Sequence, residues 1–540
     1  MVKSDIFKAQ NTILSAAIVL AVATGINAVL GFVKSRVLTA NFGTSTDLAM
    51  FYTADRIPNL IYSVLVLGAL STIFIPVFTQ EYKKNKQLAW KTASSMINSS
   101  LIFFIVMGVV FYLFSYQIIS LQALGKFSPE YIALGSNMMR IMLAAQLILV
   151  ISSFFTSILQ SFKYFLIPAL APIVYNLGVV FGTLLLAPKF GIYGPVFGVL
   201  IGATLHLLIQ IPAMIKTDFR FSFSLNFKDK GIRDIFALMP PRIISVLIAN
   251  VISTVNNSLA ILVSATSVIY LKFAGQLQFF PVNLFGISIA SAVLPTLSAE
   301  TDDPNYKTFK KTFLTSLHQM FYLVIPISVI LLVLRVPVVR LVYGVSRFPW
   351  EATVKTSYAL AFYSISIFAE SAVYILTRAF YALKDTKTPV LVSGVTIVIN
   401  VLLSLLFIKV FGFGVWSVAF SFSITSIIDM LAMLYLLSKR VGGFGAGKLL
   451  IPFVKISYAA AVMGVCLYLP LKTLDEFVFD TTRTFNLMLL TGIAGALGMT
   501  AYLFFTKLFK VEEIELFYKL IRRLTPFKTE KVVPIEEVSQ

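Results

Sequence analysis

Apolar segments recur along almost the whole chain and are separated by short polar connections. A helix needs about 20 apolar residues to cross the roughly 30 Å hydrocarbon core of a bilayer. The pattern therefore predicts about fourteen transmembrane helices, placed near residues 11–33, 48–78, 94–116, 133–160, 165–187, 191–214, 235–263, 268–297, 311–335, 355–381, 387–409, 412–437, 449–470 and 485–507.

The composition agrees with this pattern. Of the 540 residues, 58% are hydrophobic and only 13% are charged, and the mean hydropathy is +0.89. Soluble domains are much less apolar, so the predicted fold class is an all-α integral membrane protein. The first apolar segment is too long for a signal peptide and is followed by Lys34 and Arg36, which favours a membrane span.

Basic residues account for the net charge of +20, and they gather in even-numbered connections and in the C-terminal segment. Examples are Lys83 in the second connection, Arg220 in the sixth and Lys307 in the eighth. Short basic connections stay in the cytoplasm, so both termini are expected there. The charges form no single basic face, so no nucleic-acid partner is expected.

The chain also contains an internal repeat. Lys163, Pro168 and Gly191 recur with identical spacing as Lys384, Pro389 and Gly412. An even number of helices in each half makes the repeat parallel, which is typical of secondary transporters. The predicted division is a six-helix lobe over 1–220, a second over 221–440, two further helices over 441–510, and a basic cytoplasmic tail over 511–540.

That tail contains an amphipathic pattern between Val511 and Leu524. It predicts a helix lying on anionic lipid headgroups, and a solvated helical end without a partner is the alternative.

Charged side chains within apolar spans are the main candidates for function, because a charge at the bilayer centre costs about 2.5–3.5 kcal/mol or more. They are mostly cationic in the first half and in spans seven and eight, which fits an anionic head group such as a diphosphate. The candidate cavity residues are Lys34, Arg36, Asp55, Arg56, Arg242 and Asn256. Glu370 and Arg378 are candidates for coupling or gating. Pro58 and Pro281 are expected to kink or interrupt their helices beside this cavity.

No motif indicates an enzyme or a bound cofactor. The run Gly442–Lys448 lacks the Ser or Thr that a phosphate-binding loop requires, and His206 and His318 lie on different spans without metal-ligand spacing. The driving force is therefore expected to come from an ion gradient of Na⁺ or H⁺, from the membrane potential, or from a partner.

Several short motifs stand near the span ends. They are Leu30-Gly31-Phe32, Phe42-Gly43, Ile57-Pro58-Asn59, Phe74-Ile75-Pro76, Gly286 followed by Leu294-Pro295, and Lys384-Asp385-Thr386-Lys387-Thr388-Pro389. Together, over roughly residues 1–440, they resemble the MurJ/MviN lipid II flippases of the multidrug/oligosaccharidyl-lipid/polysaccharide exporter superfamily. The resemblance implies a V-shaped two-lobed bundle in the bacterial cytoplasmic membrane. Such a bundle would move lipid II, an undecaprenyl-diphosphate-linked peptidoglycan precursor, to the outer leaflet by alternating access.

The resemblance also bears on single residues. Lys34 matches a basic position of the family, Asp47 resembles an acidic position that is a candidate for coupling or gating, and Gln276 stands at a cavity position where the family has arginine. Ala28 and Tyr62 also replace usual arginines. These departures leave open a paralogue that flips another lipid-linked oligosaccharide.

Three further functions stay open at this point. They are an ion-coupled multidrug exporter, a membrane transferase acting on polyprenyl-linked sugars, and a scaffold for cell-wall synthesis proteins.

Overall fold

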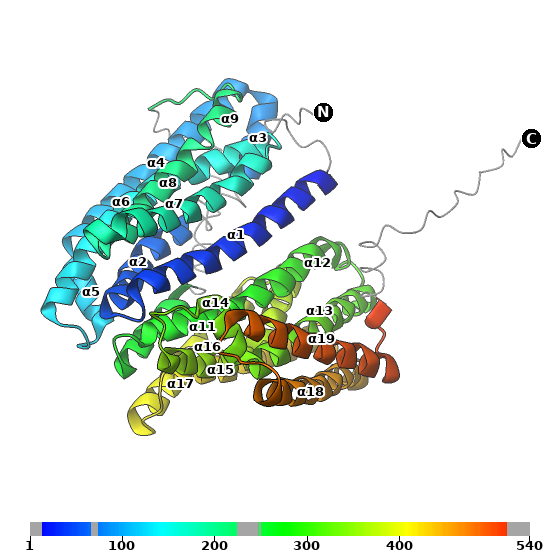
Figure 1. The fold of residues 1–540 in the computed structure, drawn as a ribbon. Coiled ribbons are helices and arrows are strands. Elements are labelled where there is room, and N and C mark those ends of the chain that lie inside the picture. The colour runs from blue at the N-terminus through cyan, green and yellow to red at the C-terminus, as the bar shows by residue number, and fades with distance from the viewer. Residues whose placement is uncertain (1–12, 66–73, 224–246, 248–249, 516–540) are drawn as a thin grey trace, which may run out of the picture. The chain divides into compact units, whose positions relative to one another are not determined.

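The computed structural model describes residues 13–65, 74–223, 247 and 250–515 (Figure 1). All regular elements in these residues are helices. The chain divides into two compact units. Unit 1 comprises Met1–Phe280, Leu334–Ala369 and Asp385–Met433, and unit 2 comprises Pro281–Val333, Glu370–Lys384 and Leu434–Gln540.

Unit 1 contains most of the N-terminal helices and several from the middle of the chain. They are α1 (Ile13–Phe42), α2 (Thr46–Leu65), α3 (Ile75–Lys84), α4 (Lys86–Leu113), α5 (Ser115–Ala123), α6 (Pro129–Ser161), α7 (Leu166–Phe190), α8 (Tyr193–Leu208), α9 (Ile211–Ile215), a short apolar helix (Asn250–Val263), α11 (Ser267–Pro281), α14 (Arg335–Tyr343), α16 (Lys387–Leu405) and the π-helix η3 (Leu406–Val410).

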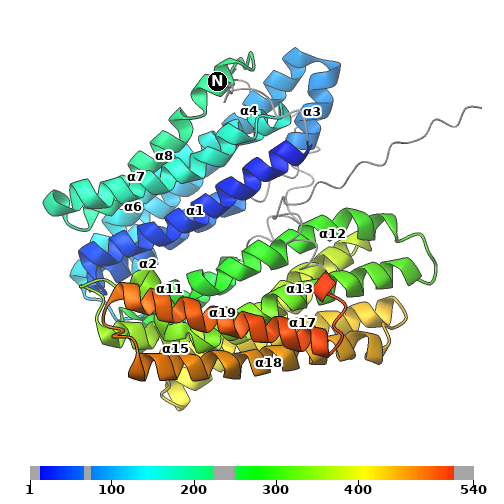
Figure 2. The same ribbon diagram turned by 45° about the vertical axis from the view of Figure 1, so that its right-hand side comes forward.

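Unit 2 is built mainly from C-terminal helices. They are the π-helix η2 (Val282–Ile287), α12 (Ser288–Ala299), α13 (Lys307–Val333), α18 (Ala446–Phe477) and α19 (Thr484–Leu508). Figure 2 shows α18 and α19 side by side, with α13 packed against α18. Two long helices contribute residues to both units: α15 (Trp350–Ala382) and α17 (Trp416–Arg440).

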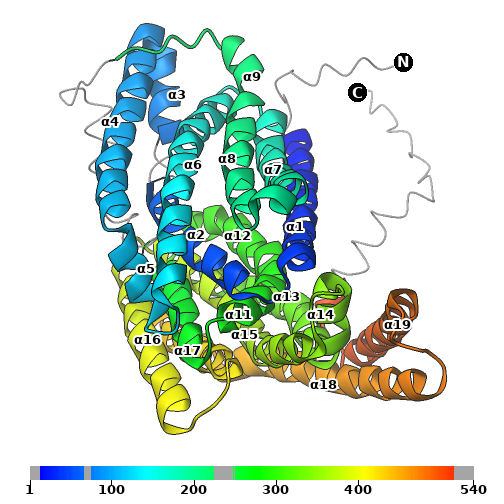
Figure 3. The ribbon, with the colours of Figure 1, turned by 60° about the vertical axis from the view of Figure 1, so that its left-hand side comes forward.

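Glycines bring α7 and α8 into backbone contact, and Figure 3 shows these two helices running side by side. A Cβ atom built on Gly182 would lie 2.3 Å from the Cα of Gly198, and one on Gly178 would lie 2.4 Å from the Cα of Gly202. Small residues four apart allow this close approach, which replaces the missing hydrophobic drive between helices in lipid.

Eleven of the described helices are long and apolar enough to cross a membrane. They confirm the predicted all-α membrane class. The number fourteen stays a prediction, because spans 11–33, 48–78 and 235–263 are not among the eleven and each includes residues outside the described part of the chain. Charges within α2 also lower its hydropathy.

Proline affects two predicted spans differently. At Pro281 the regular helix α11 ends and the π-helix η2 begins, as the sequence predicts for an interruption. A Cβ built on Gly286 of η2 would lie 2.8 Å from the Cβ of Ser371, so this stretch packs tightly against α15. Pro58, by contrast, lies within α2 without ending it.

The repeated motif has matching local geometry in both places. Lys163 and Lys384 are left-handed, with φ of 62° and 58°, and Gly191 and Gly412 have φ of 56° and 65°. Each lysine lies between two helices, so the same turn precedes α7 and α16. The arrangement of the two predicted six-helix lobes stays a prediction. The predicted tail helix lies largely outside the described residues, beyond residue 515.

Candidate functional site

Four charged side chains from three helices of unit 1 come together. Lys34 lies on α1, Asp55 and Arg56 lie on α2, and Lys272 lies on α11. The Asp55 carboxylate interacts electrostatically with all three cations. We call these four residues the charge cluster. It contains three cations and one carboxylate, so it carries an excess of positive charge.

Arg56 stands out within the charge cluster. Its Nη1 and Nη2 atoms are buried and have no hydrogen-bond partner among the described residues. Asp55 precedes it directly on α2, and successive helical side chains point about 100° apart, so the two cannot form a simple neutralised pair. Burying unsatisfied charged donors is costly, which is typical of a group that waits for an anionic ligand.

Lys34 and Lys272 meet different surroundings. The Lys34 ammonium lies over the Tyr175 ring on α7, at 5.8 Å from its centroid. Lys272 has an exposed side chain, although its neighbours Leu271 and Phe273 are buried. The charge cluster therefore has one cation against an aromatic face and one in accessible space.

Gln276 joins α11 to α1. Ser35 Oγ donates a hydrogen bond of 2.9 Å to Gln276 Oε1. A Cβ built on Gly31 would lie 3.6 Å from Gln276 Nε2, so the helices approach closely here. Gln276 is four residues from Lys272 and thus stands one helical turn away.

A polar network continues from the charge cluster along α2 to α6. Gln146 Nε2 donates to Asn59 Oδ1 over 3.3 Å, and the hydroxyls of Tyr62 and Ser153 lie 2.8 Å apart. Gln146 is fully buried. Polar side chains in the bilayer need such partners, so this network orders the α2 face that carries Asp55.

Arg36, another predicted cavity residue, binds the end of a neighbouring helix. Its Nη1 donates to the carbonyl oxygens of Leu341 and Val342, at 2.6 and 3.2 Å. These carbonyls belong to the last turn of α14, where free acceptors and the helix dipole favour a cation. Arg347, which follows α14, donates a hydrogen bond to the carbonyl of Asn41 at the end of α1. The predicted phosphate contact of Arg36 is untested.

The other predicted unit 1 residues are scattered. Asp47 lies in the first turn of α2, where a negative charge favours the helix dipole. Asn256 is 3% exposed, and its buried Oδ1 has no hydrogen-bond partner in the ranges that the structure describes. Arg242 lies outside the described residues.

Glu370 and Arg378 lie on the part of α15 that belongs to unit 2. With Tyr374 they follow one another at four-residue intervals, so all three share one helix face. Tyr374 interacts electrostatically with both charges. Their predicted role in coupling or gating stays a prediction.

Lys272 is the main residue that sequence reasoning left out of the candidate site, although it was visible as a charge within span eight. Its position one helical turn before Gln276, in an otherwise apolar run, could have indicated that it belongs to the same site. Tyr175 gave no such signal, because an aromatic residue within a span is ordinary. Among the described residues, no group of three or more His, Cys, Asp or Glu side chains could hold a metal.

Comparison with known proteins decides the family. The family model described as lipid II flippase MurJ matches residues 38–485 of the chain. The chain belongs to the MurJ lipid II flippase family. The match includes α2 and α11, and thus three of the four residues of the charge cluster.

Relatives within the MurJ family match between 72% and 92% of the chain in the two examples that follow. A probable lipid II flippase MurJ from Buchnera aphidicola subsp. Acyrthosiphon pisum is 28% identical over 506 residues, which cover 92% of this chain and 97% of the relative. The lipid II flippase MurJ of Burkholderia cenocepacia is 25% identical over 397 residues, covering 72% and 77%.

Solved structures agree with the family. A lipid II flippase MurJ in an inward closed conformation has a TM-score of 0.76 and 25% identity, and the match covers 94% of this chain and all of that one. An inward-facing multidrug resistance MATE family transporter has a TM-score of 0.66 at 15% identity, covering 79% and 98%, which shows a shared fold.

Proposed function

We propose that this chain moves lipid II from the cytoplasmic to the outer leaflet of the bacterial cytoplasmic membrane by alternating access. Membership of the MurJ family over nearly the whole chain supports this cargo. The single structural observation that supports it best is the charge cluster, with its excess of cations and the unsatisfied guanidinium of Arg56.

The chemistry of the cargo fits these groups. A diphosphate offers several oxygen acceptors, and a guanidinium binds such groups through two parallel hydrogen bonds. Arg56 has two unsatisfied nitrogens for this purpose, and Lys272 adds an accessible ammonium. Asp55 holds the cations together when no cargo is bound, and the diphosphate would compete with it for them.

The polar network on α2 and α6 would serve the sugar and peptide parts of the cargo. Such groups lose their water on entering the bilayer and need replacement partners. The Gln146 Oε1 has no hydrogen-bond partner among the described residues, and it would accept one from the cargo once the helices part to expose it. The long apolar tail needs no such partners and would remain in lipid.

The driving force is proposed to be the membrane potential or an ion gradient. Moving one negative charge outward through an inside-negative potential is favourable by about 2.3 kcal/mol per 100 mV. The basic connections support cytoplasmic termini, and labelling of single cysteines placed at residues 3 and 530 from either side would check that orientation.

The test is replacement of a host's own lipid II flippase by this chain during depletion. We expect growth to continue and lipid II to become accessible to an external probe in the outer leaflet. The double variant Lys34→Met with Arg56→Met should insert normally and fail to rescue. Failure of the unaltered chain, with insertion confirmed, would contradict the proposal.

A further inference from the structure

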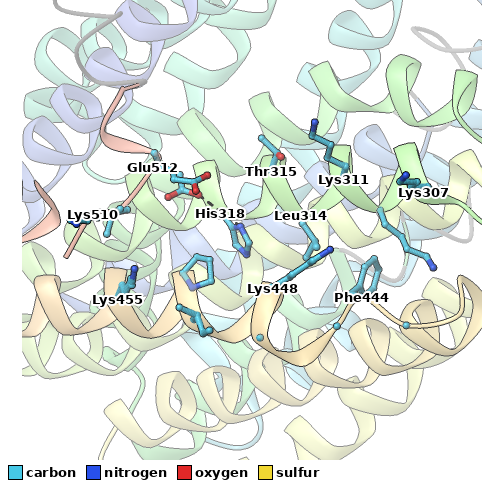
Figure 4. A pocket seen from close by; sticks show the side chains of 18 of the residues that line it. Lys307, Lys311, Leu314, Thr315, His318, Phe444, Lys448, Lys455, Lys510 and Glu512 are labelled. Atoms are coloured by element: carbon cyan, nitrogen blue, oxygen red, sulfur yellow. Dashed lines mark ion pairs between the residues drawn. The ribbon is translucent and has the colours of Figure 1, made fainter.

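Unit 2 contains a second gathering of cations, at one end of α13, α18 and α19. It lines a pocket of about 1010 Å³ (Figure 4). We call it the lysine pocket, after the six lysines that line it: Lys307, Lys310, Lys311, Lys448, Lys455 and Lys510. They come from the start of α13, the start of α18 and the residues after α19.

The turn before α18 shapes one wall of the lysine pocket. Gly443 and Gly445 have φ of 87° and 80°, a conformation that suits glycine. Between them, the buried Phe444 ring stacks on Phe313 of α13, with centroids 4.9 Å apart. This ring contact holds the turn against α13, so this wall of the pocket is ordered.

The two helix N-termini at the pocket differ. That of α13 is already closed, because Asp303 accepts hydrogen bonds from the backbone N–H groups of Asn305 and Lys307, at 3.0 and 2.8 Å. The N-terminus of α18 has Gly445 at its cap position and no side-chain acceptor in the described part of the chain. Its free N–H groups therefore offer donors to an anion.

The acidic groups of the pocket do not neutralise six lysines. Among the described residues they are Glu512, which is exposed, and Glu513, whose Oε1 lies 3.8 Å from His318 Nδ1. The His318 side chain is only 8% exposed and interacts with the backbone of Leu449, while its buried Nε2 atom has no hydrogen-bond partner within 3.5 Å among the described residues. The described part of the pocket thus carries an excess of ammonium groups over carboxylates, beside a largely buried imidazole.

The pocket continues into apolar surface on α18. Ile451 lines it and is 56% exposed, and the neighbouring Leu450 and Val454 are 53% and 59% exposed. Since α18 is long and apolar enough to span the membrane, these side chains suit acyl chains. A ligand that carries both a phosphate and hydrocarbon would satisfy both parts of the surface.

We propose that the lysine pocket binds the phosphate-bearing headgroup of an anionic phospholipid, with its acyl chains against the exposed apolar face of α18. Basic pockets between transmembrane helices recognise such headgroups. The predicted topology places the pocket on the cytoplasmic side. The proposal is independent of the flipping activity, since it concerns unit 2 alone.

The test uses the full-length protein in detergent, mixed with phosphatidylglycerol or cardiolipin and analysed by native mass spectrometry. We expect the unaltered protein to retain anionic lipid in preference to phosphatidylcholine. The triple variant Lys311→Gln, Lys448→Gln and Lys455→Gln should lose this retention by about tenfold or more. A matched control removes three exposed lysines of unit 1, by Lys83→Gln, Lys84→Gln and Lys91→Gln, and should retain lipid normally.

Two further arms separate the outcomes. If the triple variant unfolds in phosphatidylcholine, anionic lipid retention is compared between two single variants, Lys448→Arg and Lys448→Gln. Lys448→Arg keeps the charge and should retain lipid, and Lys448→Gln removes it and should lose lipid. Equal lipid retention by the pocket and control variants would overturn the proposal. So would displacement of the lipid by inorganic phosphate at equal concentration, because the ligand would then be a soluble anion.

Discussion

The charge cluster of unit 1 and the lysine pocket of unit 2 both gather cations, but in different solvents. In the cluster, three cations surround one carboxylate within membrane helices, and the Arg56 nitrogens are buried. In the pocket, the lysines stand at helix ends and most of them are exposed. Water solvates most lysines of the pocket, whereas in the cluster the Arg56 nitrogens depend on the protein and only Lys272 is exposed.

The two sites should therefore differ in how strongly a single substitution affects ligand binding. Charges inside spans are expensive, so they are few, and each must find a partner or a ligand. Charges at helix ends cost little, so many can share one task, and each contributes about 1 kcal/mol to anionic binding. We therefore expect large effects from single changes in the cluster and small ones in the pocket.

The largest effect is expected for Arg56→Met. Loss of charge-assisted hydrogen bonds worth about 3 kcal/mol should lower lipid II translocation by roughly 100-fold. The melting temperature should not fall, because the change removes buried donors that have no partner. Translocation assays and thermal melts on the same preparation measure both. A large fall in melting temperature would show that Arg56 serves stability instead.

Lys272→Met should lower translocation by about tenfold, since one ammonium contact to a phosphate is worth roughly 1.4 kcal/mol. Lys272→Arg should keep most of the activity. The control is Lys355→Met in the same unit, because Lys355 is 44% exposed and paired with Glu351 at 2.6 Å. Equal losses of translocation for Lys272→Met and Lys355→Met would show that Lys272 has no specific role in cargo binding.

Arg36→Gln tests whether a cation near the cluster in sequence belongs to it. Arg36 donates hydrogen bonds to two backbone carbonyls at the end of α14, so its loss should lower the free energy of unfolding by about 1–3 kcal/mol. Dependence of translocation on lipid II concentration should be unchanged. A weaker apparent affinity for lipid II with normal stability would instead place Arg36 in the cavity, as the sequence predicts.

The smallest effect is a pH dependence in the lysine pocket. Burial and the neighbouring Glu512 raise the pKa of Glu513, while the backbone and Lys455 oppose the rise. The folded protein therefore binds the proton more readily than the unfolded chain, and stability should fall as pH rises from 4.5 through the raised pKa.

Over the same interval anionic lipid retention should weaken, by less than about threefold, because a negative charge appears beside Lys455 and His318. Glu513→Gln should flatten this dependence in the native mass spectrometry assay. An unchanged pH profile in that variant would assign the dependence to another group.

Much of the fold follows from local pattern. The predicted spans near 133–160, 165–187 and 485–507 correspond to α6, α7 and α19 within a few residues. Hydrocarbon allows no unpaired backbone, so an apolar run of sufficient length becomes a helix whatever surrounds it. Proline was a less certain guide, because the regular helix ends at Pro281 but α2 continues through Pro58.

The candidate site could be predicted only in part. Lys34, Asp55 and Arg56 were found as charges within spans, and Gln276 through the family resemblance. Their association with Lys272 and Tyr175 depends on which helix faces meet, and hydropathy does not contain that information. Arg36 shows the same limit, since its partners on α14 are about three hundred residues away in sequence, as the hydrogen bonds record.

By itself the sequence determined the membrane class, the positions of most helices and the family, because lipid imposes one rule on every spanning segment. The tertiary structure decided which charges meet, which cation binds a helix end and which lysines share a pocket. Those outcomes depend on the rotation and packing of helices, and in lipid these are set by close contacts such as the glycines of α7 and α8.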